Sequence, residues 1–165
     1  MIIEPISRNH NREAFDCGVD ELTRFLREQA FQDHRKDLSR TFVMVDEDAD
    51  PSRIIGYHTL VMLHVTQDEL PPDKLKIKRS IPAILLGQLA IDQGFQKRGY
   101  GEYLLMDAQA KVDHIAQKTG VRGMVLDARN EELVRWYEDH DFARKEGSLR
   151  MFKSIDLIRK LKLNE

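Results

Sequence analysis

The order of predicted strands and helices in this chain indicates an α/β (α+β) fold, in which helices flank a single mixed, mostly antiparallel sheet. Two early strand-like segments, 40–46 and 53–65, are joined by a short turn, which is typical of antiparallel hairpins. The segment 83–92 is continuously apolar and is therefore expected in the middle of the sheet. Strand and helix patterns alternate after it, before a closing hairpin.

The first two predicted elements are a short strand and an amphipathic helix. Residues 1–7 are strand-like, and Pro5 suggests an edge position because proline cannot donate to a sheet ladder. Apolar side chains recur with helical spacing in residues 17–36, where Asp20 is the expected N-cap. These apolar residues are Leu22, Phe25, Leu26 and Ala30.

Two further strands should form a hairpin. Residues 40–46 and 53–65 are rich in β-branched and apolar side chains, and the segment 46–52 between them is an acidic turn. Residues 66–82 are polar, charged and contain prolines, so we expect a loop or a short excursion there before the central strand.

The second half alternates helices and strands. A helical stripe follows residue 101, and Gly120 is expected to end that helix. Residues 122–128 are strand-like, and Asn130 is expected to cap a helix at 131–140. The stripe consists of Leu104, Leu105, Ala108, Val112, Ile115 and Ala116. The last segments predict a hairpin at 142–145 and 148–155, followed at 156–162 by a closing helix or a tail.

The composition agrees with one soluble globular domain over residues 1–165. Hydrophobic residues make up 41% and charged residues 33%, which excludes a disordered chain. The net charge of −2 argues against a broad nucleic-acid-binding surface but allows a local basic patch. The single cysteine, Cys17, excludes an internal disulfide. Since we find no signal-peptide pattern and no membrane-spanning apolar run, we expect a cytoplasmic protein that does not bind membranes.

A basic, glycine-bearing turn, QKRGYG at residues 96–101, separates the central strand from a helix. A helix N-terminus presents unpaired N–H groups and a partial positive charge, and glycines let a ligand approach these amides. Lys97 and Arg98 can add charge-assisted bonds to phosphate. The turn therefore favours a pyrophosphate site, although Gly99 and Gly101 would equally serve a tight turn without any ligand.

Other chemical motifs are missing from the sequence. The turn matches neither the Walker loop nor the three-glycine dinucleotide fingerprint. There is no H-E-x-x-H pattern and no cysteine pair, so we expect no metal site. His58, His64 and Cys17 are expected to be core or solvated residues rather than ligands or nucleophiles.

Two linked motifs resemble the GNAT superfamily of N-acetyltransferases. Residues 89–105, LAIDQGFQKRGYGEYLL, are similar to its acetyl-coenzyme A motif, Q/R-x-x-G-x-G/A after a strand. Residues 126–142, LDARNEELVRWYEDHDF, resemble its second motif of strand, asparagine, helix and tyrosine. Asp141 departs from it, because a glycine is common at that position. The resemblance implies a GNAT-type sheet.

The first half resembles the toxin branch of this superfamily. The similar segments are residues 15–36, GYHTL at 56–60 and IPAILLGQLAID at 81–92. Members of that branch are encoded beside ribbon-helix-helix antitoxins and acetylate the amino group of aminoacyl-tRNA. The resemblance thus implies acetyl-coenzyme A as co-substrate, aminoacyl-tRNA as acceptor, a ribbon-helix-helix antitoxin as partner and a homodimer.

The resemblance also assigns roles to residues. The backbone of Leu89, Ala90 and Ile91 would hold the pantetheine arm as an added strand does, and Asn130 would lie near that arm. The pyrophosphate would be bound by Gln96, Lys97, Arg98, Gly99, Tyr100 and Gly101.

Tyr137 matches the general acid of the superfamily. A phenol near the leaving sulfur can protonate it as the tetrahedral intermediate collapses, a step typically worth ~10²–10⁴-fold. The spacing of Leu133, Trp136 and Tyr137 suits the packed face of a short helix equally well. Gln88 stands where many acetyltransferases carry a glutamate base, so the acceptor amine is expected to need no dedicated base.

Two basic groups are candidates for binding an RNA backbone. The first comprises Arg35, Lys36 and Arg40. In the second, Lys74, Lys76 and Lys78 share a face if the chain is extended, and Arg79 lies beside them. A solvated edge whose lysines discourage strand addition explains these charges equally well.

The sequence therefore favours an acetyl-coenzyme A-dependent N-acetyltransferase that blocks translation. One alternative is a housekeeping acetyltransferase acting on a small amine or a protein N-terminus. Another, of a different class, is a non-catalytic coenzyme A-binding or partner protein in which Tyr137 is structural.

Overall fold

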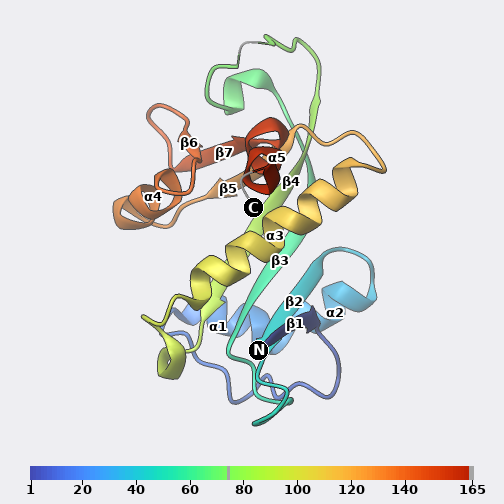
Figure 1. Ribbon diagram of the computed structural model, residues 1–165, viewed down its shortest axis with the longest axis vertical. Coiled ribbons are helices and arrows are strands. Elements are labelled where there is room, and N and C mark those ends of the chain that lie inside the picture. Colours follow the sequence, from blue (N-terminus) through green and yellow to red (C-terminus); the bar gives the residue numbers. More distant parts are fainter. Residues whose placement is uncertain (74, 164–165) are drawn as a thin grey trace. The chain divides into compact units, whose positions relative to one another are not determined.

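The computed structural model describes residues 1–73 and 75–163. Within them, seven strands form a sheet in the order β1-β2-β3-β4-β5-β7-β6 (Figure 1). Pair β4–β5 is parallel, whereas β1–β2, β2–β3, β5–β7 and β6–β7 are antiparallel. The expected mixed sheet, with the apolar segment at its centre, is confirmed. The strands are β1 Ile2–Pro5, β2 Arg40–Val45, β3 Gly56–Val65, β4 Ile81–Ile91, β5 Gly123–Asp127, β6 Ala143–Arg144 and β7 Arg150–Ser154.

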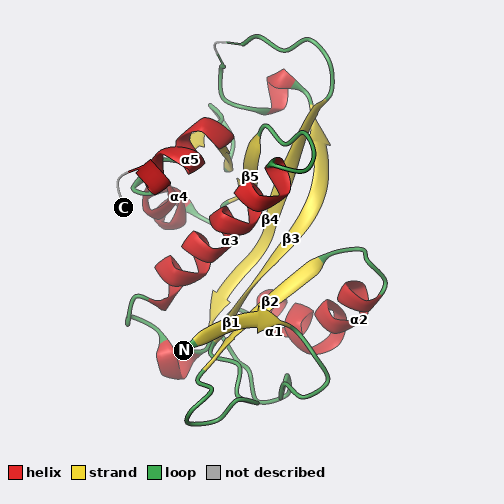
Figure 2. Ribbon diagram, turned by 45° about the vertical axis from the view of Figure 1, so that its right-hand side comes forward, coloured by secondary structure: helices red, strands yellow, loops and turns green. Residues whose placement is uncertain are grey.

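Helices connect these strands where the sequence predicts them (Figure 2). The α-helices are α1 Asp20–Arg24, α2 Ala30–Arg35, α3 Tyr100–Ala116, α4 Glu131–Glu138 and α5 Ile155–Leu163. Short 3₁₀ turns occupy Gln67–Glu69 and Gln93–Phe95, and a π-helical turn occupies Phe25–Gln29. No helix in the described part of the chain is long and apolar enough to span a membrane. Helix α3 ends at Ala116, and Gly120, expected to end it, lies beyond its last turn.

The chain forms two compact units. The first comprises Met1–Val61 and Leu86–Ala108, and the second comprises Met62–Leu85 and Gln109–Glu165. Strands β3 and β4 contribute residues to both units. The single-domain interpretation of residues 1–165 stays a prediction, and each unit is described below by itself.

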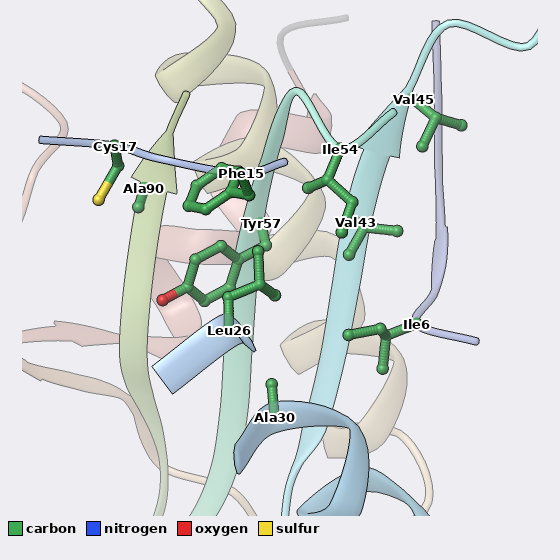
Figure 3. Close-up of a cluster of buried hydrophobic side chains, with 10 residues drawn as sticks. All are labelled: Ile6, Phe15, Cys17, Leu26, Ala30, Val43, Val45, Ile54, Tyr57 and Ala90. Atoms are coloured by element: carbon green, nitrogen blue, oxygen red, sulfur yellow. The ribbon is translucent and has the colours of Figure 1, made fainter. Parts of the chain in front are cut away.

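The core of the first unit gathers around Tyr57 on β3. Its ring is fully buried, meets Phe15 edge-on at 5.5 Å between centroids and stacks on Phe25 at 6.3 Å. Figure 3 shows the ring beside Phe15 and Leu26, with the remaining apolar side chains around it. The cluster comprises Ile6, Phe15, Cys17, Leu26, Ala30, Val43, Val45, Ile54, Tyr57 and Ala90.

Tyr57 also explains why the predicted 17–36 helix is interrupted. Its hydroxyl donates to the carbonyl of Leu22 at 2.6 Å. A side-chain donor inserted into a helical ladder displaces the regular i→i−4 bond, and the next turn is π-helical. The expected N-cap, Asp20, is wrong, because Val19 holds that position and Asp20 is the first helical residue.

In the second unit, β4, β5 and β7 bury an apolar cluster with the residues that precede β4. Its buried members are Val65, Leu70, Ile81, Ala83, Val125 and Phe152. Residues 66–73 and 75–80 contain one 3₁₀ turn and no strand, in agreement with the predicted loop, although Ile81 and Pro82 already belong to β4. Arg122 links this segment to α5 by pairing with Asp73 at 3.2 Å and with Asp156 at 3.1 Å.

Candidate active site

The 96–101 loop lies in the first unit, where β4 leads into α3. Two of its residues have left-handed backbones, Lys97 with φ 62° and Gly99 with φ 82°. Alternation of this kind turns successive N–H groups toward one side and forms an anion-binding concavity. A Cβ atom at Gly99 would meet no atom within 4 Å, so φ, not crowding, requires glycine there.

Asp92 fixes the start of this loop. One carboxylate oxygen accepts the N–H of Gly94 at 2.9 Å, and the other accepts the N–H of Asp16 at 3.0 Å. The residue is only 4% exposed. Because both oxygens are engaged with backbone donors, Asp92 is a structural residue of the loop and is poorly placed to act as a base.

Gln96 fastens the loop from its other end. Its side-chain amide donates to the carbonyls of Ile91 and Cys17, each at 2.9 Å. The side chain therefore ties the loop to the end of β4 and to the 16–18 segment. Because the side-chain amide of Gln96 is engaged with these two carbonyls, the predicted contact of Gln96 with pyrophosphate would be made by its backbone N–H.

Cationic groups surround the loop. Arg98 donates to the carbonyl of Gly94 at 3.0 Å and lies over the Phe95 ring at 5.3 Å, and Lys97 is exposed. Arg53 covers the same ring at 5.5 Å and approaches Asp92 at 3.5 Å. Sequence reasoning missed Arg53, which comes from the turn before β3 and carries no local motif. The positive charge favours a phosphate ligand.

The predicted pantetheine strand forms the end of β4. Ala90 is buried in the Tyr57 cluster, while Leu89 and Ile91 are partly exposed and pack on a second cluster with Met44. Tyr100, at the start of α3, belongs to that second cluster as well. The loop and the strand thus share an apolar support within the first unit.

Asn130 and Tyr137 lie on α4, in the second unit. Asn130 is the N-cap, as predicted, and its side-chain oxygen accepts the N–H of Leu133 at 2.9 Å. Arg144 anchors the same end of the helix through two bonds of 2.7 Å to Glu131. The orientation of α4 is therefore fixed at its first turn.

A Schellman-type ending fixes the other end of α4. The N–H of Phe142 bonds to the carbonyl of Tyr137 at 3.1 Å, and the N–H of Asp141 bonds to that of Glu138 at 3.0 Å. Asp141 has φ 68°, a conformation that favours glycine, which explains the residue common in the family at this position.

Tyr137 is held between two aromatic rings. The ring of Trp136 lies edge-on to the Tyr137 ring with 4.9 Å between the centroids, and the ring of Phe142 does so with 5.5 Å. Tyr137 is 8% exposed. Burial raises the pKa of the Tyr137 hydroxyl well above its ordinary value. A phenol in this state keeps its proton at neutral pH, as a general acid must, and the packed arrangement suits the structural alternative equally well.

The candidate RNA-binding cations are mostly exposed. In the first unit Arg35, Lys36 and Arg40 are exposed, and Arg40 also pairs with Asp37 and donates to the carbonyl of His34 at 2.7 Å. In the second unit Lys76, Lys78 and Arg79 are exposed. Lys74 lies outside the described residues.

The lysines of the second basic group would share a face only in an extended chain, and the chain is not extended at Lys76. Lys76 has φ 46°, and residues 75–80 form no strand. A left-handed residue breaks the alternation on which a shared lysine face depends. Across residues 1–73 and 75–163, no group of three or more His, Cys, Asp or Glu side chains could hold a metal ion.

A model of the acetyltransferase (GNAT) family matches residues 6–142. The chain belongs to the GNAT family of acetyltransferases. It is an acetyl-coenzyme A-dependent N-acetyltransferase, and the predicted superfamily membership is confirmed.

Two relatives of this chain are named as toxins. A probable toxin TacT from Sinorhizobium fredii is 29% identical over 97% of this chain and 94% of the relative. A tRNA-acetylating toxin from Mycobacterium tuberculosis is 30% identical over 78% of this chain and 76% of the relative.

Solved structures agree with this relationship. The structure of AtaT complexed with acetyl-methionyl-tRNA is 25% identical, has a TM-score of 0.88, and is matched over 98% of each chain. AtaTR bound with acetyl-coenzyme A is 27% identical, with a TM-score of 0.83, and is matched over 98% of this chain and 97% of the other.

Proposed function

We propose that this acetyltransferase moves the acetyl group of acetyl-coenzyme A to the α-amino group of aminoacyl-tRNA and acts as a translation-blocking toxin. The carrying observation is the likeness, over 98% of the chain, to a structure of AtaT with acetyl-methionyl-tRNA. The relative named a tRNA-acetylating toxin supports the same acceptor.

The proposed roles follow the two motifs. The 96–101 loop, with Arg53 beside it, binds the pyrophosphate, and the backbone of Leu89, Ala90 and Ile91 holds the pantetheine arm. The amine attacks the thioester carbonyl. As the tetrahedral intermediate collapses, the carbon–sulfur bond breaks and the Tyr137 hydroxyl protonates the departing sulfur. The phenolate then recovers the proton that the acceptor nitrogen releases.

Gln88, together with Asp92 after β4 and Asp127 at the end of β5, favours an α-amino acceptor. Gln88 cannot accept a proton, Asp92 is engaged with backbone N–H groups, and Asp127 forms two bonds, of 2.9 and 3.0 Å, with Arg150. A lysine side chain, with a pKa of about 10.4, would need such a base. An α-amino group, at about 7.7–8.0, is already partly neutral at pH 7, and the ester of aminoacyl-tRNA lowers its pKa further.

The test is acetyl transfer from labelled acetyl-coenzyme A at pH 7. We expect a pool of charged tRNAs to be labelled on the aminoacyl group, while uncharged tRNA and a lysine-containing peptide with a blocked N-terminus remain unlabelled. Comparable turnover of the lysine peptide would contradict the proposal and favour the housekeeping alternative.

The proposal extends to partners and location. We propose a cytoplasmic homodimer that a ribbon-helix-helix antitoxin neutralises, in keeping with the toxin branch that the sequence resembles. A monomeric mass in light scattering at assay concentrations would exclude the dimer, and unaffected acetyl transfer in the presence of the neighbouring gene product would exclude that partner.

A further inference from the structure

Lys153 on β7 is buried in an unusual way for a lysine. It is 1% exposed, and its ammonium donates to the carbonyl of His140 at 2.9 Å. The nitrogen also lies 5.7 Å from the centre of the Phe142 ring. Lysines are almost never fully buried without a partner, so the position is expected to serve a purpose that an apolar residue could not.

The burial of Lys153 is costly. Desolvation lowers the pKa of its ammonium, and the nearby Asp141 opposes that change. Replacing a buried charged group with an apolar one of similar volume is often neutral or stabilising. A contribution to the stability of the fold therefore does not explain why a lysine is present at position 153. The contacts that Lys153 makes at the end of α4 explain it better.

Those contacts surround the turn that seats Tyr137. His140 and Phe142 flank the left-handed Asp141, and Lys153 touches both of them. The Phe142 N–H and ring both contact Tyr137, through the 3.1 Å bond to its carbonyl and the edge-on ring contact. A cation near the last helical carbonyls also opposes their partial negative charge.

We propose that Lys153 is a positioning residue, which holds the 137–142 turn and thereby orients the Tyr137 hydroxyl. The inference rests on the proposed acid role of Tyr137. Lys153 itself touches no substrate in this proposal and acts through His140 and Phe142.

Steady-state kinetics on charged tRNA test the proposal. Lys153→Met removes the donor at nearly constant volume, and Lys160→Met, on the exposed part of α5, is the control. We expect kcat to fall about tenfold or more in Lys153→Met, because small misplacements of catalytic groups are costly. KM for acetyl-coenzyme A and the rate of Lys160→Met should not change. An unchanged kcat in Lys153→Met would overturn the proposal.

A double-mutant cycle separates positioning from general damage. In a Tyr137→Phe background, Lys153→Met should cost nothing further, since the hydroxyl that it orients is already absent. Loss of the same factor in both backgrounds would refute the role. Lys153→Gln, which removes the charge and shortens the donor, carries the same test if the methionine variant does not fold.

Trp136 provides a readout that needs no acceptor. It is the single tryptophan of the chain, and it packs on Tyr137 and on His140, whose ring centre lies 4.6 Å away. We expect its fluorescence to change in Lys153→Met and to stay constant in Lys160→Met. Unchanged emission in Lys153→Met would sink the inference even if charged tRNA proved to be the wrong acceptor, so the two proposals can fail separately.

Discussion

At the scale of residues, the environment of Tyr137 connects packing with chemistry. The rings of Trp136 and Phe142 bury the phenol, and this burial raises its pKa. The neutral phenol is therefore maintained by the same contacts that would define a packing residue. Burial alone does not separate the two roles, whereas removal of the hydroxyl with the ring retained does.

Tyr137→Phe should lower kcat by ~10²-fold or more, the size of a lost general acid. Affinity for acetyl-coenzyme A should not change, because the ring and its packing remain. Isothermal calorimetry and steady-state kinetics measure the two quantities. Tyr103→Phe, on the exposed face of α3 at 63% exposure, is the matched control. Equal activity of wild type and Tyr137→Phe would make Tyr137 a packing residue.

The pH dependence of the wild type follows from the same burial. A tyrosine is protonated below its pKa, and burial raises that pKa above the usual value of about 10. The acid form should therefore persist throughout the range from pH 6.5 to about 9.5. We expect kcat/KM to rise as the acceptor amine loses its proton and then to form a plateau, without an alkaline decline due to Tyr137.

Single residues also mark the limit of sequence interpretation. Asn130 was predictable as a cap because its bond closes within three residues. Arg53 and Lys153 were not, because each acts on a segment distant in sequence. The Asp20 prediction failed because the extended backbone that precedes the helix falls on Val19.

At the scale of elements, the passage from β4 to α3 depends on bonds made by its side chains. Asp92 holds the first turn, Gln96 holds the middle, and the left-handed Gly99 leads into the helix. The open space at Gly99 is consistent with a ligand that approaches the backbone there. Two substitutions at this position separate backbone strain from charge.

Gly99→Ala should weaken binding of coenzyme A modestly, since a left-handed alanine costs roughly 1–2 kcal/mol and its methyl group meets no protein atom. Gly99→Glu should abolish binding, because it adds a negative charge where phosphate oxygens are expected. Calorimetry gives the affinities, and circular dichroism checks that both variants fold. If Gly99→Glu bound coenzyme A as the wild type does, the loop would not be the pyrophosphate site.

Elements with a strong local pattern were predictable. The hairpin β2–β3, the central strand β4 and the hairpin β6–β7 all follow their hydrophobic patterns. The interrupted first helix was not predictable, since its cause is the hydroxyl of Tyr57, far away in sequence. Residues 75–80 were predicted as part of a loop, but the left-handed backbone of Lys76 was not predictable, because a polar loop has no periodicity to interpret.

At the scale of the whole molecule, positive and negative side chains nearly balance, and the net charge is only −2. No general attraction for RNA follows from such a balance. The exposed basic residues of the two candidate groups are therefore expected to provide the electrostatic part of tRNA binding. They are Arg35, Lys36 and Arg40 in the first unit and Lys76, Lys78 and Arg79 in the second.

The salt dependence of KM for charged tRNA should identify the group that contacts phosphates. Each lost contact should reduce the slope of log KM against log salt by about 0.7–0.9. We expect this reduction in a paired glutamine substitution of Arg35 and Lys36, of Lys78 and Arg79, or of both. Glutamine at the exposed Lys118 and Lys160 is the control. If the slope stayed at the wild-type value in both paired variants, these side chains would be solvent-exposed charges that do not contact the tRNA phosphates.

The division of the chain into units has a consequence for biosynthesis. The first unit needs residues up to Ala108, and the second combines Met62–Leu85 with residues that follow Ala108. During translation the 96–101 loop, the proposed pyrophosphate site, can therefore reach its folded environment while the segment that carries Tyr137 is still in the ribosome. At ~5–20 residues per second, the stretch from Gln109 to α5 takes several seconds to emerge. An enzyme proposed to stop ribosomes would thus acquire Tyr137, its proposed general acid, only late in its own synthesis.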